Sequence, residues 1–234
     1  MTQQQNALIT GATGGIGAAI STTLAKQGFG LCLVGRRAPA LTELASECSQ
    51  YSARVEILCG DLADAEFLDT VVERAEAQLG PVDVLVNNAG MALRGSITDI
   101  DLGHWRQLQE LNLNVAVALS QQVVPGMAAR DGGAIINISS ISGRNTHAGG
   151  AAYVASKHAL NGFTGCLFED VREHNIKVSS IMPGFVRTDM TAAMSLDAEK
   201  MLAPDDVAAA VSYVLSTSST CCPTEIVLRP QRAP

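Results

Sequence analysis

The chain has 234 residues, of which 47% are hydrophobic and 17% charged, so it can bury one large core without disulfides or metals. Its formal net charge is −7, and the sequence contains no run of basic residues. Because nucleic acids and anionic membranes attract clustered positive charge, this composition argues against both as partners.

The N-terminal segment resembles neither a targeting signal nor an anchor. Met1–Gln5 is polar, and Gly11 interrupts the apolar stretch that follows. A signal peptide needs a longer apolar run, and a spanning helix needs about 20 apolar residues. We therefore expect a cytoplasmic protein.

The cysteines and histidines are scattered along the chain. Its six cysteines form no CxxC pair, and its four histidines lack the spacing of metal ligands. We expect the cysteines to be reduced and mostly buried as small hydrophobic residues, and we expect no metal site.

Short apolar runs alternate with amphipathic segments of helix length from end to end, which is typical of repeated βα units. The seven expected strands are Ala7–Ile9, Leu31–Val34, Val55–Leu58, Val82–Val86, Ala134–Ile138, Lys177–Ile181 and Glu225–Leu228. Apolar residues recur at helical spacing over 41–48, 68–79 and 207–214. We predict a single α/β domain over 1–234: a Rossmann-type, doubly wound fold whose seven-stranded, mainly parallel sheet has helices on both faces.

A glycine-rich turn, Thr10–Gly17, joins the first expected strand to a helix over Ala18–Lys26. Glycines permit positive φ angles and close approach of backbone N–H groups to a phosphate, and the helix dipole favours the anion. A structural turn would have the same composition, but the strand before and the helix after favour a dinucleotide site. The cofactor contacts expected in this turn are Gly11, Thr13, Gly14 and Ile16.

The end of the second strand, Gly35-Arg36-Arg37, is where cofactor choice is expected. A carboxylate there would bind the ribose hydroxyls of NAD, whereas a guanidinium can bind the 2′-phosphate of NADP. We therefore expect a preference for NADP(H), with NAD(H) possible; the alternative is that both arginines are only solvated. After the third strand, Asp61 and Leu62 are expected at the adenine, although Asp61 could equally cap the next helix.

Tyr153 and Lys157 lie four residues apart in an expected helix, so the phenol and the ammonium share one face. A cation beside a phenol favours the phenolate and moves the phenol pKa toward neutral pH. Such a pair is also common on protein surfaces. Catalysis is favoured by Ser139-Ser140, which ends an expected strand at the carboxyl edge of the sheet, where sites form.

These residues resemble the short-chain dehydrogenase/reductase family over essentially the whole chain. Besides the glycine turn and the Tyr-Lys pair, the matching motifs are Asn87–Gly90, Asn112 in Leu111–Leu113, Ser140 and Pro183–Thr188. The resemblance implies an oxidoreductase that moves a hydride between a nicotinamide and a carbonyl or hydroxyl carbon.

The resemblance also implies residue roles. Tyr153 would be the acid or base, Lys157 would lower its pKa and bind the nicotinamide ribose, and Ser140 would polarise the substrate carbonyl. Asn112 would hold a water for proton supply. The remaining implied cofactor contacts are Asn88, Val186 and Thr188.

Two features depart from the family pattern. Gly14 stands where NADP-using members often carry a basic residue, which leaves the 2′-phosphate to Arg36, helped by Arg37. The expected substrate lid, Asp189–Ala203, is short and indicates an open or small pocket. Candidate apolar wall residues, each of which could instead be ordinary packing, are Leu93, Phe185, Met190, Met194 and the segment Arg144–Gly149.

The segments Trp105–Val124 and Ala151–Val171 carry apolar residues on more than one helical face. Family members commonly pair through these helices, so a homodimer or homotetramer is expected, with extra core burial as the alternative.

The function that we predict is that of an NADP(H)-dependent carbonyl reductase or alcohol dehydrogenase acting on a ketone, aldehyde or secondary alcohol. A keto group on a larger carrier-bound or polyol substrate is within reach of the same machinery. One alternative is an NAD-dependent alcohol dehydrogenase, which the absence of a carboxylate at Gly35 disfavours. The other is a catalytically silent NAD(P)-sensing regulator, which the four filled catalytic positions disfavour.

Overall fold

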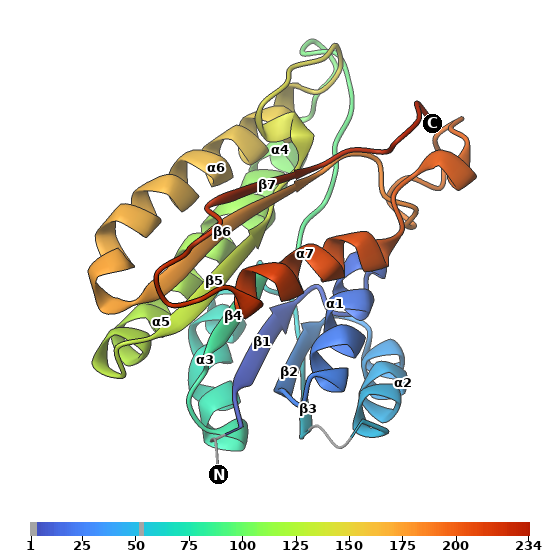
Figure 1. Cartoon of the computed structure of the whole chain (residues 1–234). Helices are drawn as coiled ribbons and strands as arrows, with labels where there is room; N and C mark the ends of the chain where they lie inside the picture. The colour runs from blue at the N-terminus through green and yellow to red at the C-terminus, as the bar shows by residue number, and fades with distance from the viewer. Residues whose placement is uncertain (1–3, 52–53) are drawn as a thin grey trace.

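The computed structural model describes residues 4–51 and 54–234, so Met1 to Gln3 of the polar N-terminal segment lie outside the described residues. Within these ranges the chain forms one seven-stranded sheet in the order β3-β2-β1-β4-β5-β6-β7. All six neighbouring pairs are parallel. The predicted doubly wound α/β fold is confirmed, and the sheet is wholly parallel in the described part of the chain (Figure 1).

Strands and helices alternate along the chain. The strands are β1 (Asn6–Thr10), β2 (Gly30–Gly35), β3 (Val55–Cys59), β4 (Val84–Asn87), β5 (Gly133–Ile138), β6 (Ile176–Pro183) and β7 (Glu225–Leu228). The α-helices are α1 (Gly15–Lys26), α2 (Ala38–Ser49), α3 (Ala65–Leu79), α4 (Leu102–Gln109), α5 (Val115–Ala129), α6 (Ala151–Val171) and α7 (Pro204–Ser216). Shorter segments are a π-helix (Glu110–Asn114) and 3₁₀-helices at Ile141–Gly143, Arg172–His174 and Ala198–Lys200.

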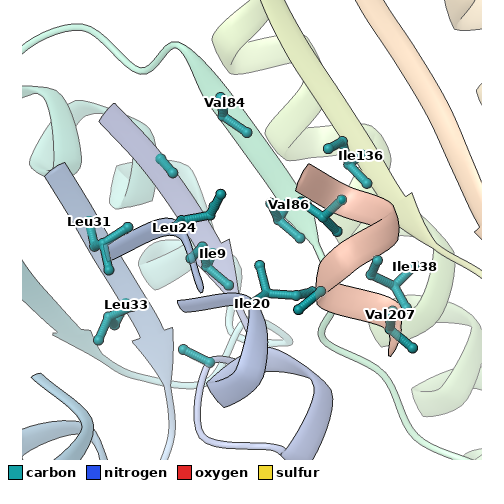
Figure 2. Close-up of a cluster of buried hydrophobic side chains, with 14 of the residues drawn as sticks. Ile9, Ile20, Leu24, Leu31, Leu33, Val84, Val86, Ile136, Ile138 and Val207 are labelled. Carbon is teal, nitrogen blue, oxygen red and sulfur yellow. The ribbon is translucent and has the colours of Figure 1, made fainter. Parts of the chain in front are cut away.

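Two apolar clusters sandwich the sheet, because its central strands are buried on both faces. Helices α1, α2 and α7 cover one face, and α3, α5 and α6 cover the other (Figure 1). On the first face, Figure 2 shows side chains of four strands, such as Ile9 and Ile136, gathered against Ile20 of α1 and Val207 of α7. The core is therefore built mainly from aliphatic residues.

The strand order reverses between β1 and β4, which places a crevice at the carboxyl edge of the sheet. The chain runs outward from β1 through β2 to β3, then crosses back to β4 on the other side of β1. Loops after β1 and β4 diverge at this point, and ligands of doubly wound sheets bind there.

The structure corrects two expected helix boundaries. Helix α1 begins at Gly15, three residues earlier than expected, because the glycines of the turn form its first turn. The segment expected as one helix over Trp105–Val124 is instead α4 and α5, joined by the π-helix Glu110–Asn114. Asn112 lies in this π-helix, and π-helical turns are frequent at functional sites.

The expectation that the cysteines are mostly buried is wrong. Cys32 and Cys48 are buried, Cys222 is half-buried, and Cys59, Cys166 and Cys221 are exposed. Of the exposed three, Cys59 ends β3, Cys166 lies in α6 and Cys221 lies in the loop before β7. All six thiols are free.

Among the described residues, no helix is both long and apolar enough to cross a membrane. No group of three or more His, Cys, Asp or Glu side chains there is arranged to hold a metal ion.

Candidate active site

A cleft of about 820 Å³ opens at the carboxyl edge of the sheet, above the reversal of strand order. This volume suits a small-molecule or cofactor site. All but one of the predicted site residues line it: Gly11, Thr13, Gly14, Ile16, Arg36, Asp61, Leu62, Asn88, Ser140, Tyr153, Lys157, Val186 and Thr188. Asn112 lies behind the wall, buried beneath it.

Two glycines of the turn after β1 are required by close packing. Gly11 has a φ of +61°, and a Cβ there would lie 2.9 Å from the Cα of Ala89. A Cβ on Gly17 would lie 2.8 Å from Asn88 Nδ2 and closer still to the carbonyl oxygen of Gly11. Asn88 Nδ2 donates to the carbonyl oxygens of Thr10 and Gly11, each at 3.0 Å. Asn88 therefore fixes the turn from the neighbouring strand end.

The start of α1 provides an anion-binding surface. Gly14 is the N-cap, no side chain caps this terminus, and α1, which lies wholly within the described residues, has no acidic residue in its first turn. Gly14, Gly15 and Ile16 all line the cleft. Exposed N–H groups and the positive end of the helix dipole favour a phosphate, so this surface fits the pyrophosphate of a dinucleotide.

A first prediction concerns Gly17. We expect Gly17→Ala to lower the free energy of unfolding by about 1–3 kcal/mol, because the methyl group forces the turn off Asn88, and to weaken nucleotide binding with it. Urea unfolding and calorimetric titration with NADPH measure both effects. Gly132→Ala is the matched control, since a Cβ at Gly132 meets nothing within 4 Å. Equal stability of the two variants would contradict the packing argument.

Polar contacts tie down the end of β2 and the start of the β3–α3 loop. Arg36 Nη1 lies 3.5 Å from Asp61 Oδ2, with side chains 65% and 43% exposed, and Arg37 Nη2 donates to the carbonyl oxygen of Thr13 at 2.8 Å. The arginines are therefore not merely solvated. An ion pair this exposed is worth about 0–1 kcal/mol, so a stronger anion can displace Asp61 from Arg36.

The alternative that Asp61 caps the next helix is wrong for α3. Its N-cap is Asp64, whose carboxylate accepts from the N–H of Glu66 at 3.0 Å, while Asp61 accepts from the N–H of Ala63 in the loop before it. Asp61 stays directed to the cleft edge beside Arg36, and Leu62 is 4% exposed beneath it.

Ser140, Tyr153 and Lys157 come together at the other end of the cleft. Ser140 follows β5, and its hydroxyl accepts from the N–H of Ser142 at 3.1 Å. Tyr153 and Lys157 lie one turn apart near the start of α6, with Lys157 Nζ 5.8 Å from the centre of the Tyr153 ring. Lys157 is only 5% exposed, and Nζ donates to the carbonyl oxygen of Ile138 at 2.9 Å. The pair is therefore part of the cleft wall, not a surface pair.

Burial dominates the titration of both groups. Burial raises the pKa of Tyr153, and the Ser140 hydroxyl and the positive charge of Arg94 oppose this rise. Burial lowers the pKa of Lys157 from 10.5 to about 8. The Ser140 hydroxyl and the Arg94 charge lower the pKa of the phenol here, while the Lys157 ammonium donates to the carbonyl oxygen of Ile138. The lowering that the family resemblance implies for Lys157 stays a prediction.

Asn112 is held in the π-helix by three hydrogen bonds. Its Oδ1 accepts from the N–H of Met91 at 2.8 Å, and its Nδ2 donates to the Met91 carbonyl oxygen at 2.9 Å and to Ser156 Oγ at 3.1 Å. Ser156 Oγ in turn donates to the carbonyl oxygen of Tyr153 at 2.8 Å. Asn112 thus joins the segment after β4 to α6 through Ser156, which the sequence analysis missed although it lies between Tyr153 and Lys157.

The segment expected as a lid consists of turns and the short helix Ala198–Lys200. Thr191 Oγ1 donates to the carbonyl oxygen of Val186 at 2.7 Å, and Val186 pairs with Leu202. A Cβ on Gly15 would lie 2.8 Å from Thr188 Cγ2, so Thr188 packs on the start of α1. This contact brings Thr188, the residue just before the expected lid, to the phosphate end of the cleft.

The apolar wall candidates line the cleft, except for Arg144, Ala148 and Gly149 of the segment Arg144–Gly149. Leu93, Phe185, Met190 and Met194 are in the wall, with residues 145–147 and Gly150 beside them. Arg94, which the sequence analysis did not single out, lines the same end, and its Nη2 lies 3.5 Å from Met194 Sδ.

One cleft of this Rossmann-type sheet combines an anion-binding helix start with a Ser-Tyr-Lys group. This combination defines a class of dinucleotide-dependent oxidoreductases. Comparisons with known proteins agree. The family model described as short chain dehydrogenase matches residues 5–199. An uncharacterized oxidoreductase of Staphylococcus aureus is 35% identical over 224 residues, 96% of either chain.

Solved structures of similar fold extend the comparison. A metagenomic short-chain oxidoreductase in complex with NADP has 32% identity and a TM-score of 0.85, covering 97% of each chain. Acetoin dehydrogenase from Salmonella typhimurium has 27% identity and a TM-score of 0.89, covering 97% of this chain and 95% of that one. The chain belongs to the short-chain dehydrogenase/reductase family and is an oxidoreductase of that family.

Proposed function

We propose that this oxidoreductase transfers a hydride between NADP(H) and a ketone, aldehyde or secondary alcohol, with Tyr153 as the acid or base. The observation that carries the proposal is the meeting of Ser140, Tyr153 and Lys157 in the same cleft as the uncapped start of α1. The phosphate surface and the proton-transfer group then serve one bound dinucleotide and one substrate.

When bound in this cleft, the dinucleotide would supply or accept the hydride at the substrate carbon. In reduction, the Ser140 hydroxyl donates a hydrogen bond to the carbonyl oxygen, where negative charge develops. Tyr153 gives its proton to that oxygen, so that the C=O bond becomes a C–OH group. In oxidation, the same phenol accepts the proton from the alcohol.

Lys157 supports this transfer from inside the wall. With a pKa of about 8, it is mainly protonated at neutral pH, and its charge stabilises a phenolate formed beside it. Asn112 and Ser156 hold α6 and the segment after β4 in register, which fixes the position of the phenol. The water that the family resemblance assigns to Asn112 stays a prediction, because its side-chain amide is bonded to Met91 and Ser156.

Cofactor preference is proposed to depend on Arg36. Its guanidinium lies at the cleft edge in an exposed ion pair with Asp61, and an NADP complex occurs among the similar structures. The opposite end of the cleft holds the chemical groups, so Arg36 is suitably placed for the 2′-phosphate at the adenosine end. Arg37 supports the turn through Thr13.

A second prediction tests this assignment. We expect Arg36→Leu to lower the ratio of kcat/KM with NADPH to that with NADH by about 10- to 100-fold, because a charge-assisted hydrogen bond to phosphate is lost. Arg130→Leu, whose guanidinium pairs with Asp83 before β4, is the control and keeps the wild-type ratio. An unchanged ratio in Arg36→Leu would show that Arg36 does not bind the 2′-phosphate.

The proposed function is tested with purified protein, NADPH or NADH, and a panel of aldehydes, ketones, diketones and oxo esters. Turnover supports an enzyme, whereas tight nucleotide binding without turnover supports the silent sensor. Failure to bind either nucleotide would overturn both. The expected homodimer or homotetramer stays a prediction.

A further inference from the structure

Among the described residues, one arginine of the cleft wall, Arg94, has neither a carboxylate nor a backbone carbonyl oxygen as a partner. Arg36, Arg37, Arg94 and Lys157 all line the cleft. Arg36 pairs with a carboxylate, and Arg37 and Lys157 donate to backbone carbonyl oxygens. Among the described residues, Arg94 forms no ion pair, and its one side-chain hydrogen-bond partner is the thioether of Met194 at 3.5 Å. A thioether is a weak acceptor, so a substrate anion would replace it easily.

Arg94 lies at the chemical end of the cleft. Its charge reaches the Tyr153 phenol, where it opposes the rise in pKa that burial causes. Its contact Met194 belongs to the lid, and Arg94, Met194 and Tyr153 all line the same cleft. A substrate with its carbonyl at Tyr153 therefore extends toward Arg94.

The segment that carries Arg94 is anchored on both sides. Met91 is bonded through its N–H and its carbonyl oxygen to the Asn112 side chain, and the N–H of Gly95 donates to the carbonyl oxygen of Gly149 at 3.1 Å. A guanidinium on a fixed segment loses less freedom on binding than one on a free loop. Preorganised arginines suit planar anions that accept two parallel hydrogen bonds.

We propose that Arg94 binds a carboxylate of the substrate, so that the preferred substrates are oxo acids and the corresponding hydroxy acids. The inference rests on the proposed function and specifies its substrate class. Asp189 also lines the cleft, and its negative charge repels a phosphate dianion more strongly than a singly charged carboxylate.

Matched substrate pairs test the inference. The panel consists of α-oxo, β-oxo and γ-oxo acids and their neutral methyl esters. The rate of NADPH oxidation is measured with each compound. We expect wild type to prefer the best acid over its ester by about 10- to 100-fold in kcat/KM, and Arg94→Met to lose this preference. Arg94→Lys should keep part of it. Arg106→Met is the control, since Arg106 is exposed on α4 outside the cleft wall and should keep the full ratio.

The outcomes separate the inference from the proposed function. Turnover of esters and ketones with no acid preference, or a preference that Arg94→Met retains, overturns the carboxylate site and leaves the oxidoreductase assignment intact. If no compound turns over, calorimetric titration of the α-oxo acid and its ester decides, with and without NADP⁺. Acid binding that Arg94→Met abolishes supports the site, and equal binding by both proteins overturns it.

Discussion

Replacing Tyr153 with phenylalanine is expected to lower kcat by about 10²- to 10⁴-fold, because the substrate oxygen then has no proton donor or acceptor. The ring and its packing remain, so the fold and NADPH binding should be retained. Ser140 and the bound dinucleotide would account for the residual rate. Stopped-flow or steady-state NADPH oxidation measures the loss, and calorimetry measures nucleotide binding.

Tyr213→Phe is the matched control for this variant. Tyr213 is 56% exposed on α7, away from the cleft wall, so the same loss of a hydroxyl there should leave kcat unchanged. A Tyr153→Phe enzyme with wild-type kcat would show that another group transfers the proton. An equal loss in both variants would point to misfolding.

Lys157→Met is expected to lower kcat on the order of 10²-fold and to change how stability depends on pH. Folding lowers the pKa of Lys157 from 10.5 to about 8, so between these values the unfolded chain binds more protons than the folded protein. The free energy of unfolding therefore increases as pH rises through this window. The full cost of burying the Lys157 charge is present below about pH 8. A shift of this size corresponds to at most about 3 kcal/mol.

The measurement is the difference in free energy of unfolding between wild type and Lys157→Met, followed by urea from neutral pH to about pH 10. The difference should move in favour of wild type as pH rises, because the methionine does not titrate. Lys26→Met, at the exposed end of α1, is the control and should follow the wild-type profile. A pH-independent difference would mean that Lys157 is not destabilised by burial.

Local sequence patterns predicted the strands well, because strand cores are short apolar runs whose burial requires little knowledge of their partners. All seven expected strands form, each within about two residues of its expected bounds. The glycine turn and the Tyr153–Lys157 spacing were also readable, since both depend on neighbours close in the chain. Ser140 and Arg36 were readable because each follows a strand end.

Other features depended on long-range contacts that local patterns do not encode. The π-helix at Asn112 forms where its amide meets Met91, 21 residues away in the chain. The exposure of Cys166 depends on whether a second layer covers the outer face of α6.

The sequence by itself determined the fold class, the glycine turn and the residue types of the site, because periodicity, turn chemistry and short spacings are local properties of the chain. Only the tertiary structure decided which charges are already paired and which side chains are buried. It placed the Lys157 ammonium against Ile138, joined Arg36 to Asp61, and left Arg94 facing the cleft. Charge pairing and burial depend on distances between segments far apart in sequence, and these distances exist only after the sheet has formed.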